Sequence, residues 1–228
     1  MKRIFSFFMC LFWVNANYAQ TPARVLLSSG NISTHEYQIY EPSKIIKTTI
    51  SQSKNETIEA LMSSILNADS QEKVNFNTLE GEKNTEQKSE KDFLQIKNRN
   101  IEKTYFEIIS KLEFQSGGQF FSIVKFKLHI EQVPNGISGA YQLQKVRNQW
   151  YKTSRSDLSE IALMMVFFKP TILKDLLSNT TTTEILMLDL KKATTDGSGL
   201  NFKKLYNEFS TWEKDKIKTQ YFLEPTGW

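Results

Sequence analysis

Two adjacent stretches in which hydrophobic and polar residues alternate constrain the fold more than any other feature of this sequence. In residues 105–114, the even-numbered residues, which share one side of an extended strand, are Phe106, Ile108, Ser110, Leu112 and Phe114. In residues 120–131, one parity is mostly apolar, from Phe120 to Ile130, and the other carries Lys125, Lys127 and His129. A period of two is typical of a β-strand with one buried and one solvated face. We therefore expect an antiparallel sheet with one apolar face and one polar face.

Turn-forming residues separate these stretches and indicate further strands. Gly117-Gly118 predicts a tight hairpin, because glycine adopts positive φ without strain. Pro134 and Gly136 end the second strand, and a third follows. Asn148 predicts another tight reversal, after which Trp150 anchors the last strand in the core. Residues 104–153 are thus expected to form about four strands.

The flanking segments divide the rest of the chain. Asn55 is a candidate N-cap for a helix with an apolar stripe, formed by Ile58, Leu61, Met62, Ile65 and Leu66, and this helix is expected to cover the sheet. Residues 80–92 contain no hydrophobic side chain, which predicts a solvated, mobile loop, or alternatively a lid or a partner-binding segment. We expect an α+β fold: residues 20–53 as an extended segment, 54–155 as a helix plus antiparallel sheet domain, and 156–228 as a helical unit packed on it.

The order of these elements resembles that of a known superfamily. A helix, a gap and then long strands that end in Tyr141-Gln142-Leu143-Gln144-Lys145-Val146-Arg147-Asn148-Gln149-Trp150-Tyr151 resemble nuclear-transport-factor-2-like domains, over roughly residues 54–153. The resemblance implies a cone in which a curved sheet wraps around an N-terminal helix. The superfamily includes enzymes, binding proteins and structural components, so the resemblance does not select a function. No residue set here matches the Asp/His/Tyr constellations of its enzymatic members.

The N-terminus predicts export. Lys2 and Arg3 precede an apolar run from Ile4 to Val14, which is too short to span a bilayer, and cleavage is expected after Ala16 or Ala19. Residues 1–19 are therefore interpreted as a signal peptide. Cys10 is the only cysteine, so the mature chain has neither a disulfide nor a thiolate site. We expect a periplasmic or secreted protein of a Gram-negative bacterium, with no transmembrane span in the mature chain.

Charge and motif content argue against several classes of function. Removal of Lys2 and Arg3 leaves 27 basic side chains against 25 acidic ones, which argues against a nucleic-acid-binding protein. The sequence contains no nucleophile elbow, phosphate-binding loop or dinucleotide fingerprint. His35 and His129 are the only histidines, so we expect no metal site and no cofactor. His129 itself is interpreted as an exposed strand residue.

Aromatic side chains supply the candidate site. If the sheet is cone-shaped, some of them line a pocket between helix 55–68 and the concave face, where an apolar small ligand is commonly bound. The candidate ligand-binding residues are Tyr105, His129, Tyr141, Trp150 and Tyr151. The first hypothesis is an exported, non-catalytic domain that binds an envelope protein or an apolar small molecule. The alternatives are a cone-fold enzyme of the isomerase or hydrolase type, which needs a buried acid or histidine in the pocket, and a structural component of an envelope complex.

Overall fold

One open sheet organises the computed structural model, which describes residues 24–27, 30–39, 42–50, 54–177, 192, 195–196 and 199–215. Within these residues the sheet has nine strands: eight follow the order β7-β6-β5-β4-β2-β1-β9-β8, and β3 pairs with β4 off this path. The strands are β1 (Arg24–Leu27), β2 (Gly30–Ile39), β3 (Pro42–Lys44), β4 (Tyr105–Ser116), β5 (Gln119–Ile130), β6 (Val133–Val146), β7 (Gln149–Thr153), β8 (Thr195–Asp196) and β9 (Gly199–Asn201). The strand pairs are antiparallel, apart from β1 with β9. The predicted signal peptide lies outside the described residues.

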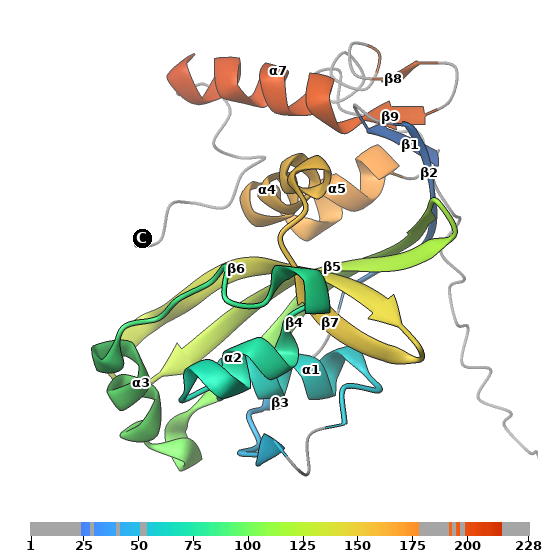
Figure 1. Ribbon diagram of the computed structural model, residues 1–228. Coiled ribbons are helices and arrows are strands. Elements are labelled where there is room, and N and C mark those ends of the chain that lie inside the picture. Colours follow the sequence, from blue (N-terminus) through green and yellow to red (C-terminus); the bar gives the residue numbers. More distant parts are fainter. Residues whose placement is uncertain are drawn as a thin grey trace, which may run out of the picture.

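Helices cover both sides of this sheet (Figure 1). On one side lie α1 (Ile58–Leu66) and α2 (Gln71–Asn77), with α3 (Glu90–Lys97) at the end of the strands. On the other side lie α4 (Ser159–Phe167), α5 (Pro170–Leu177) and α7 (Phe202–Asp215). The expected α+β class is confirmed, and β4 to β7 are the four consecutive strands that the sequence predicts. The N-terminal strands β1 to β3 and the short pair β8–β9 extend the sheet beyond them.

Helix α1 forms where the apolar spacing predicts it, but its N-cap differs from the predicted one. Thr57 has extended backbone, and its hydroxyl accepts a hydrogen bond from the amide of Ala60 at 3.1 Å, so Thr57 rather than Asn55 is the cap. Leu61 and Met62 are completely buried. Because burying such a side chain contributes about 1.5–3 kcal/mol, packing on the sheet is the main stabilisation of this short helix.

A β-bulge in β4 changes which side of the sheet its residues face. Ile108 pairs with Phe126, whereas Ser110 pairs with Lys125, so one residue of β4 is left over between these pairs. A one-residue slip moves every later side chain to the opposite face. The prediction that Phe106 and Phe114 share a face is therefore wrong, although both side chains are buried.

The sheet consequently has two apolar cores, one on each face. On the α1 side, the helix packs against a set of strand residues made up of Phe106, Ile108, Val124, Phe126, Leu128, Leu143 and Trp150. On the other side, α4, α5 and α7 pack against Leu112, Phe114, Phe121 and Ile123. The prediction of a solvated face is wrong for the middle of β5, where Phe121, Ile123 and Lys125 are at most 2% exposed. Alternate residues of a strand face opposite sides of the sheet, and helices cover both sides here. Both sets of residues are therefore buried, and the expected contrast between a buried and a solvated face is lost.

Residues 80–92 are anchored along the edge strand β7. The Glu82 carboxylate accepts hydrogen bonds from the Thr153 hydroxyl at 2.5 Å and from the Ser154 amide at 2.6 Å. The Leu79 amide donates to the carbonyl of Lys152 at 2.9 Å, which occupies one of the outward-facing groups of the edge strand. The segment stays largely exposed, as its composition predicts, but it is attached to the sheet and is not a free loop.

Candidate ligand-binding groove

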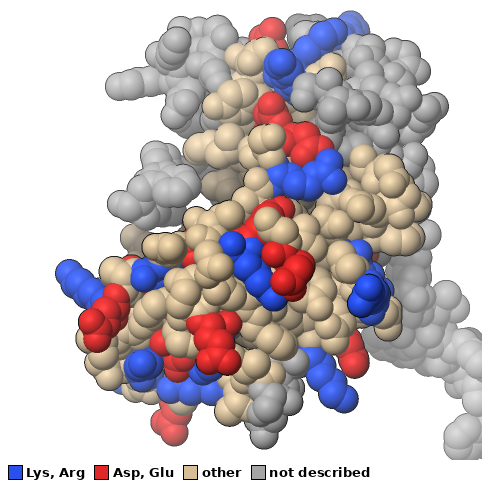
Figure 2. Space-filling model, viewed as in Figure 1, with Lys and Arg blue, Asp and Glu red and all other residues tan. Residues whose placement is uncertain are grey.

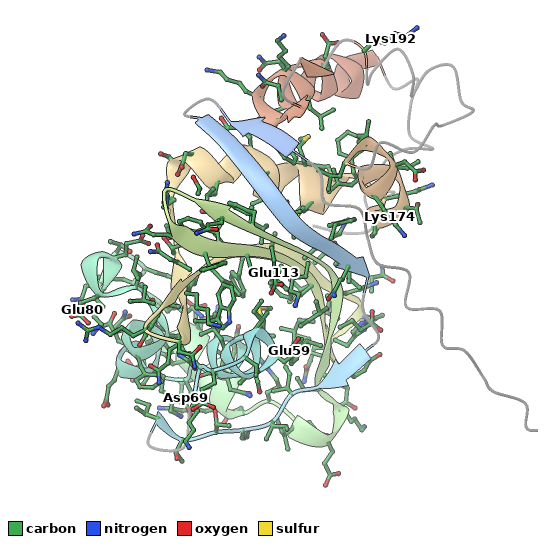
Figure 3. The ribbon with its side chains drawn as sticks, turned by 90° about the vertical axis from the view of Figure 1, so that its right-hand side faces the viewer. Glu59, Asp69, Glu80, Glu113, Lys174 and Lys192 are labelled. Carbon is green, nitrogen blue, oxygen red and sulfur yellow. The ribbon has the colours of Figure 1, made fainter. Side chains whose placement is uncertain are left out.

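A groove of about 630 Å³ lies at one end of the sheet, and this volume is typical of small-molecule sites. It is bordered by the start of α1, by the ends of β4 and β5 next to their hairpin, and by the β6–β7 turn. Figure 3 shows two of its lining residues, Glu113 on the sheet and Glu59 on α1, on the side of the molecule turned toward the viewer. The groove thus opens where the helix no longer covers the sheet.

Two tight turns set the geometry of this groove. Gly117 and Gly118 both have positive φ, at 57° and 75°, and close the β4–β5 hairpin as the sequence predicts. Arg147 and Asn148 also have positive φ, at 47° and 67°, and close the β6–β7 hairpin. This second turn confirms the predicted reversal at Asn148. Positive φ at both central residues matches the twist of the flanking strands.

The floor of the groove is a row of three side chains on neighbouring strands. Phe120 on β5 pairs with Lys145 on β6, and Lys145 pairs with Trp150 on β7. Phe120 is 48% exposed, whereas Trp150 is 7% exposed and also packs in the core beneath α1. The Lys145 Nζ lies 5.7 Å from the centroid of the Trp150 ring, a cation–π distance. Phe114 and Phe121 also border the groove, but their side chains are fully buried in the opposite core.

Charged residues of both signs line the walls. Lys111 and Glu113 on β4 form an ion pair with a separation of 3.1 Å. Glu59 lies in the first turn of α1 and is exposed. Within the described part of the chain, no carboxylate oxygen lies within 4.0 Å of the side-chain nitrogens of Lys145 or Arg147. The groove therefore combines an aromatic floor with two cations that no carboxylate of the described residues neutralises.

The five residues predicted to bind a ligand do not come together in this groove. Trp150 lines it, whereas Tyr105 and His129 lie at the opposite end of β4 and β5. The rings of Tyr105 and His129 are stacked with centroids 4.3 Å apart, and the His129 Nε2 lies 3.4 Å from a carboxylate oxygen of Glu107. This places His129 beside an acid on the sheet surface, where its side chain is 20% exposed.

Tyr141 and Tyr151 occupy two further environments. Tyr141 lies on β6, and its ring stacks on that of Phe126 with the two centroids 4.8 Å apart. The Lys152 Nζ lies 4.8 Å from the centroid of the Tyr141 ring. Burial raises the pKa of Tyr141 to about 12, which keeps its hydroxyl protonated. The Tyr151 hydroxyl donates to the side-chain oxygen of Gln149 at 2.8 Å. Neither tyrosine borders the groove.

The predicted pocket between helix 55–68 and the strands is largely filled. Leu61 and Met62 occupy the space beneath the middle of α1, with no exposed surface. Near the other end of the helix, a cavity of only about 10 Å³ borders Ile65, which is at the limit for a single water molecule. Open space on this side of the sheet is therefore found at the N-terminal end of α1.

Sequence reasoning missed the residues that distinguish the groove, namely Phe120, Lys145, Arg147 and Glu113. Phe120 belongs to the parity that was expected to be buried. Lys145 and Arg147 lie on either side of Val146 at a predicted turn, so two basic residues at a reversal were the available signal. Their proximity to Phe120 depends on the register between β5 and β6, which local patterns do not reveal.

Lys125 is the most unusual ionisable residue among those described, but it does not border the groove. It is 2% exposed, and its Nζ donates to the carbonyl oxygens of Val166 and Phe168 at 2.9 and 3.0 Å. Burial lowers its pKa to about 7. A lysine of lowered pKa is also the nucleophile of Schiff-base enzymes. Here the ammonium is occupied by the end of α4, so we interpret it as a structural anchor.

Figure 2 shows acidic and basic side chains interspersed over the described part of one face. No group of three or more acidic, histidine or cysteine residues arranged to hold a metal ion occurs in the described residues. Among those same residues, every helix is too short or too polar to cross a bilayer.

No family model, curated protein or solved structure matches this chain. The similarity to nuclear-transport-factor-2-like domains therefore stays a prediction.

Proposed function

We propose that this chain is an exported, non-catalytic binding protein of the bacterial cell envelope, and that it holds an apolar small ligand in the groove. The observation that carries the proposal is the exposed Phe120 ring, which lies in one cross-strand row with Lys145 and Trp150 and lines a cavity large enough for such a ligand. An aromatic side chain that is half exposed inside a concavity gains free energy when a ligand removes it from water. Export rests on the predicted signal peptide, residues 1–19.

The groove favours binding over catalysis. An enzyme of the proposed alternative class needs a buried acid or histidine to transfer protons. Among the described residues no histidine lines the groove, and of the two described acids that do, Glu59 is exposed and Glu113 is paired with Lys111. The Thr57 hydroxyl is engaged as the N-cap of α1. A small ligand is preferred over a protein partner because the aromatic surface lies in a cavity bordered by charged walls.

Fluorescence titration of the purified mature chain with N-phenyl-1-naphthylamine, a neutral apolar probe, tests the proposal. We expect saturable binding, and we expect Phe120→Ala to weaken it about tenfold, which corresponds to a loss of ~1.4 kcal/mol. Ile137→Ala is the matched control, because Ile137 is 47% exposed on β6 but does not border the groove. Absence of saturable binding, or an equal effect of both substitutions, would contradict the proposal.

A separate expression experiment tests export. Expression of the full chain in a Gram-negative host is expected to yield periplasmic protein whose mass corresponds to cleavage after Ala16 or Ala19. Full-length protein that stays in the cytoplasm would refute this part of the proposal and would leave the binding result unaffected.

A further inference from the structure

We infer that the groove selects amphipathic monocarboxylates, that is, ligands with one carboxylate attached to an apolar body. This inference rests on the proposed function, because it names the chemical class of the ligand for the same groove. It is carried by the placement of Lys145 and Arg147 beside the aromatic floor.

Lys145 is positioned to contact both parts of such a ligand. Its cross-strand neighbours are Phe120 on one side and Trp150 on the other, so it lies in the middle of the aromatic row. Directly opposed residues on antiparallel strands lie about 5 Å apart at Cβ, within reach of one small ligand. An apolar body on Phe120 therefore brings its charged end close to the Lys145 ammonium.

Arg147 has a backbone conformation that local preference does not explain. Its φ of 47° is in the left-handed region, where glycine and asparagine are favoured and other residues are uncommon. Asn148, the other central residue of this turn, suits that region, but arginine does not. Strained backbone of this kind is concentrated at functional sites. Arg147 lines the groove, and a guanidinium is able to bind a carboxylate through two parallel hydrogen bonds.

The charges of the walls favour a single negative charge. Among the described lining residues, Lys111, Lys145 and Arg147 supply three positive charges, and Glu59 and Glu113 supply two negative ones. Glu113 pairs with Lys111, whereas no carboxylate oxygen of the described residues lies within 4.0 Å of the side-chain nitrogens of Lys145 or Arg147. Glu59, on the helix wall, disfavours further negative charge on the ligand. A monocarboxylate therefore complements the groove better than a neutral ligand or a dianion.

Competition experiments with decanoate and decanol, which share one chain length, test the inference. Each compound displaces the neutral naphthylamine probe, and we expect decanoate to do so at a concentration at least about tenfold lower at low ionic strength. The preference is expected to shrink as salt is added, because the two cations are partly exposed.

Two substitutions remove the cations with little risk to the fold. Lys145→Met keeps an unbranched apolar chain over Trp150, and Arg147→Asn places a residue that tolerates positive φ in the turn. In the double variant we expect decanoate to lose its preference, while displacement by decanol stays unchanged. Lys127→Met is the control, since Lys127 lies on the same sheet but does not border the groove.

The outcomes separate the two proposals. Equal displacement by decanoate and decanol, or a preference that survives in the double variant, overturns the inference while the proposed function stands. Lack of probe binding by the wild-type chain overturns both. Association with phosphatidylglycerol vesicles, without displacement of the probe by decanoate, also overturns the inference, because it identifies a lipid surface as the anion that is bound.

Discussion

Replacing Lys125 with methionine tests whether a buried ammonium joins the C-terminal helices to the sheet. The Lys125 Nζ donates to the carbonyl oxygens of Val166 and Phe168, which lie at the end of α4. Carbonyl groups in the last turn of a helix have no partner within the helix. Burial lowers the pKa of Lys125 from 10.5 to about 7, whereas its two acceptors and the helix dipole favour the charged form.

The sign of the effect follows from proton binding. The folded-state pKa lies below the unfolded-state value, so the unfolded chain binds more protons between about pH 7 and pH 10.5, and stability rises with pH across this window. Below about pH 7 the full cost of burying the ammonium is present, about 5 kcal/mol. Between about pH 6 and about pH 9 this group changes the free energy of unfolding by roughly 2.5 kcal/mol, an upper value because the carbonyl acceptors oppose it.

The Lys125→Met variant loses this pH dependence and leaves two buried carbonyl oxygens without a donor, at about 1–3 kcal/mol each. Near pH 6 the destabilisation from the two unpaired carbonyl oxygens is largely offset, because the variant no longer buries a charged ammonium. We therefore expect the free energy of unfolding of the variant to lie within about 2 kcal/mol of that of the wild type. Toward pH 9 the wild type gains stability and the variant does not.

Urea unfolding followed by circular dichroism at both pH values measures the difference in free energy of unfolding. We expect the free energy of unfolding of the wild type minus that of Lys125→Met to increase by up to about 2.5 kcal/mol from pH 6 to pH 9. Lys127→Met is the matched control, because Lys127 lies two residues further along the same face of β5 and is more exposed. A wild-type-minus-variant value that stays constant, or that decreases as pH rises, would refute the reasoning.

Two further predictions concern packing and the backbone. Leu61→Ala, at a fully buried position of α1, is expected to destabilise the fold by about 2–5 kcal/mol, whereas Leu94→Ala, at a position 49% exposed, should change stability by less than about 0.5 kcal/mol. Both are measured by urea unfolding, and similar losses would contradict the packing of α1. Gly136→Ala is expected to lower the free energy of unfolding by about 2 kcal/mol or more, and Gly117→Ala by about 1 kcal/mol. Both glycines have positive φ, but only at Gly136 does an added Cβ lie 2.9 Å from the Leu128 carbonyl oxygen. Equal losses of thermal stability would show that this contact relaxes freely.

Local patterns were sufficient for the central strands and their turns. The alternation in β4 and β5 and the glycine pair between them depend only on neighbouring residues, and so does the reversal at Asn148. The same is true of the apolar stripe of α1, where helical spacing places Leu61 and Met62 on one side. These features were predictable because period and positive φ are properties of a short segment.

The candidate groove was only partly predictable. The sequence indicated that Trp150 lies in the sheet and that Asn148 turns the chain, and both residues line the groove. The contribution of Phe120 and Lys145 was not apparent, because their adjacency depends on how β5 and β6 align over residues far apart in the chain. Cross-strand register is set by the whole sheet and not by either strand.

The sequence by itself determined the strands, the hairpins and the first helix, since each is encoded in a contiguous run of residues. The tertiary structure alone decided which way those residues face. One extra residue before Ser110 turns the second half of β4 toward the C-terminal helices. Those helices in turn bury Lys125 on a face that composition marks as polar. Both outcomes depend on packing between segments that are distant in the chain, and packing of that kind leaves no periodic signal in the sequence.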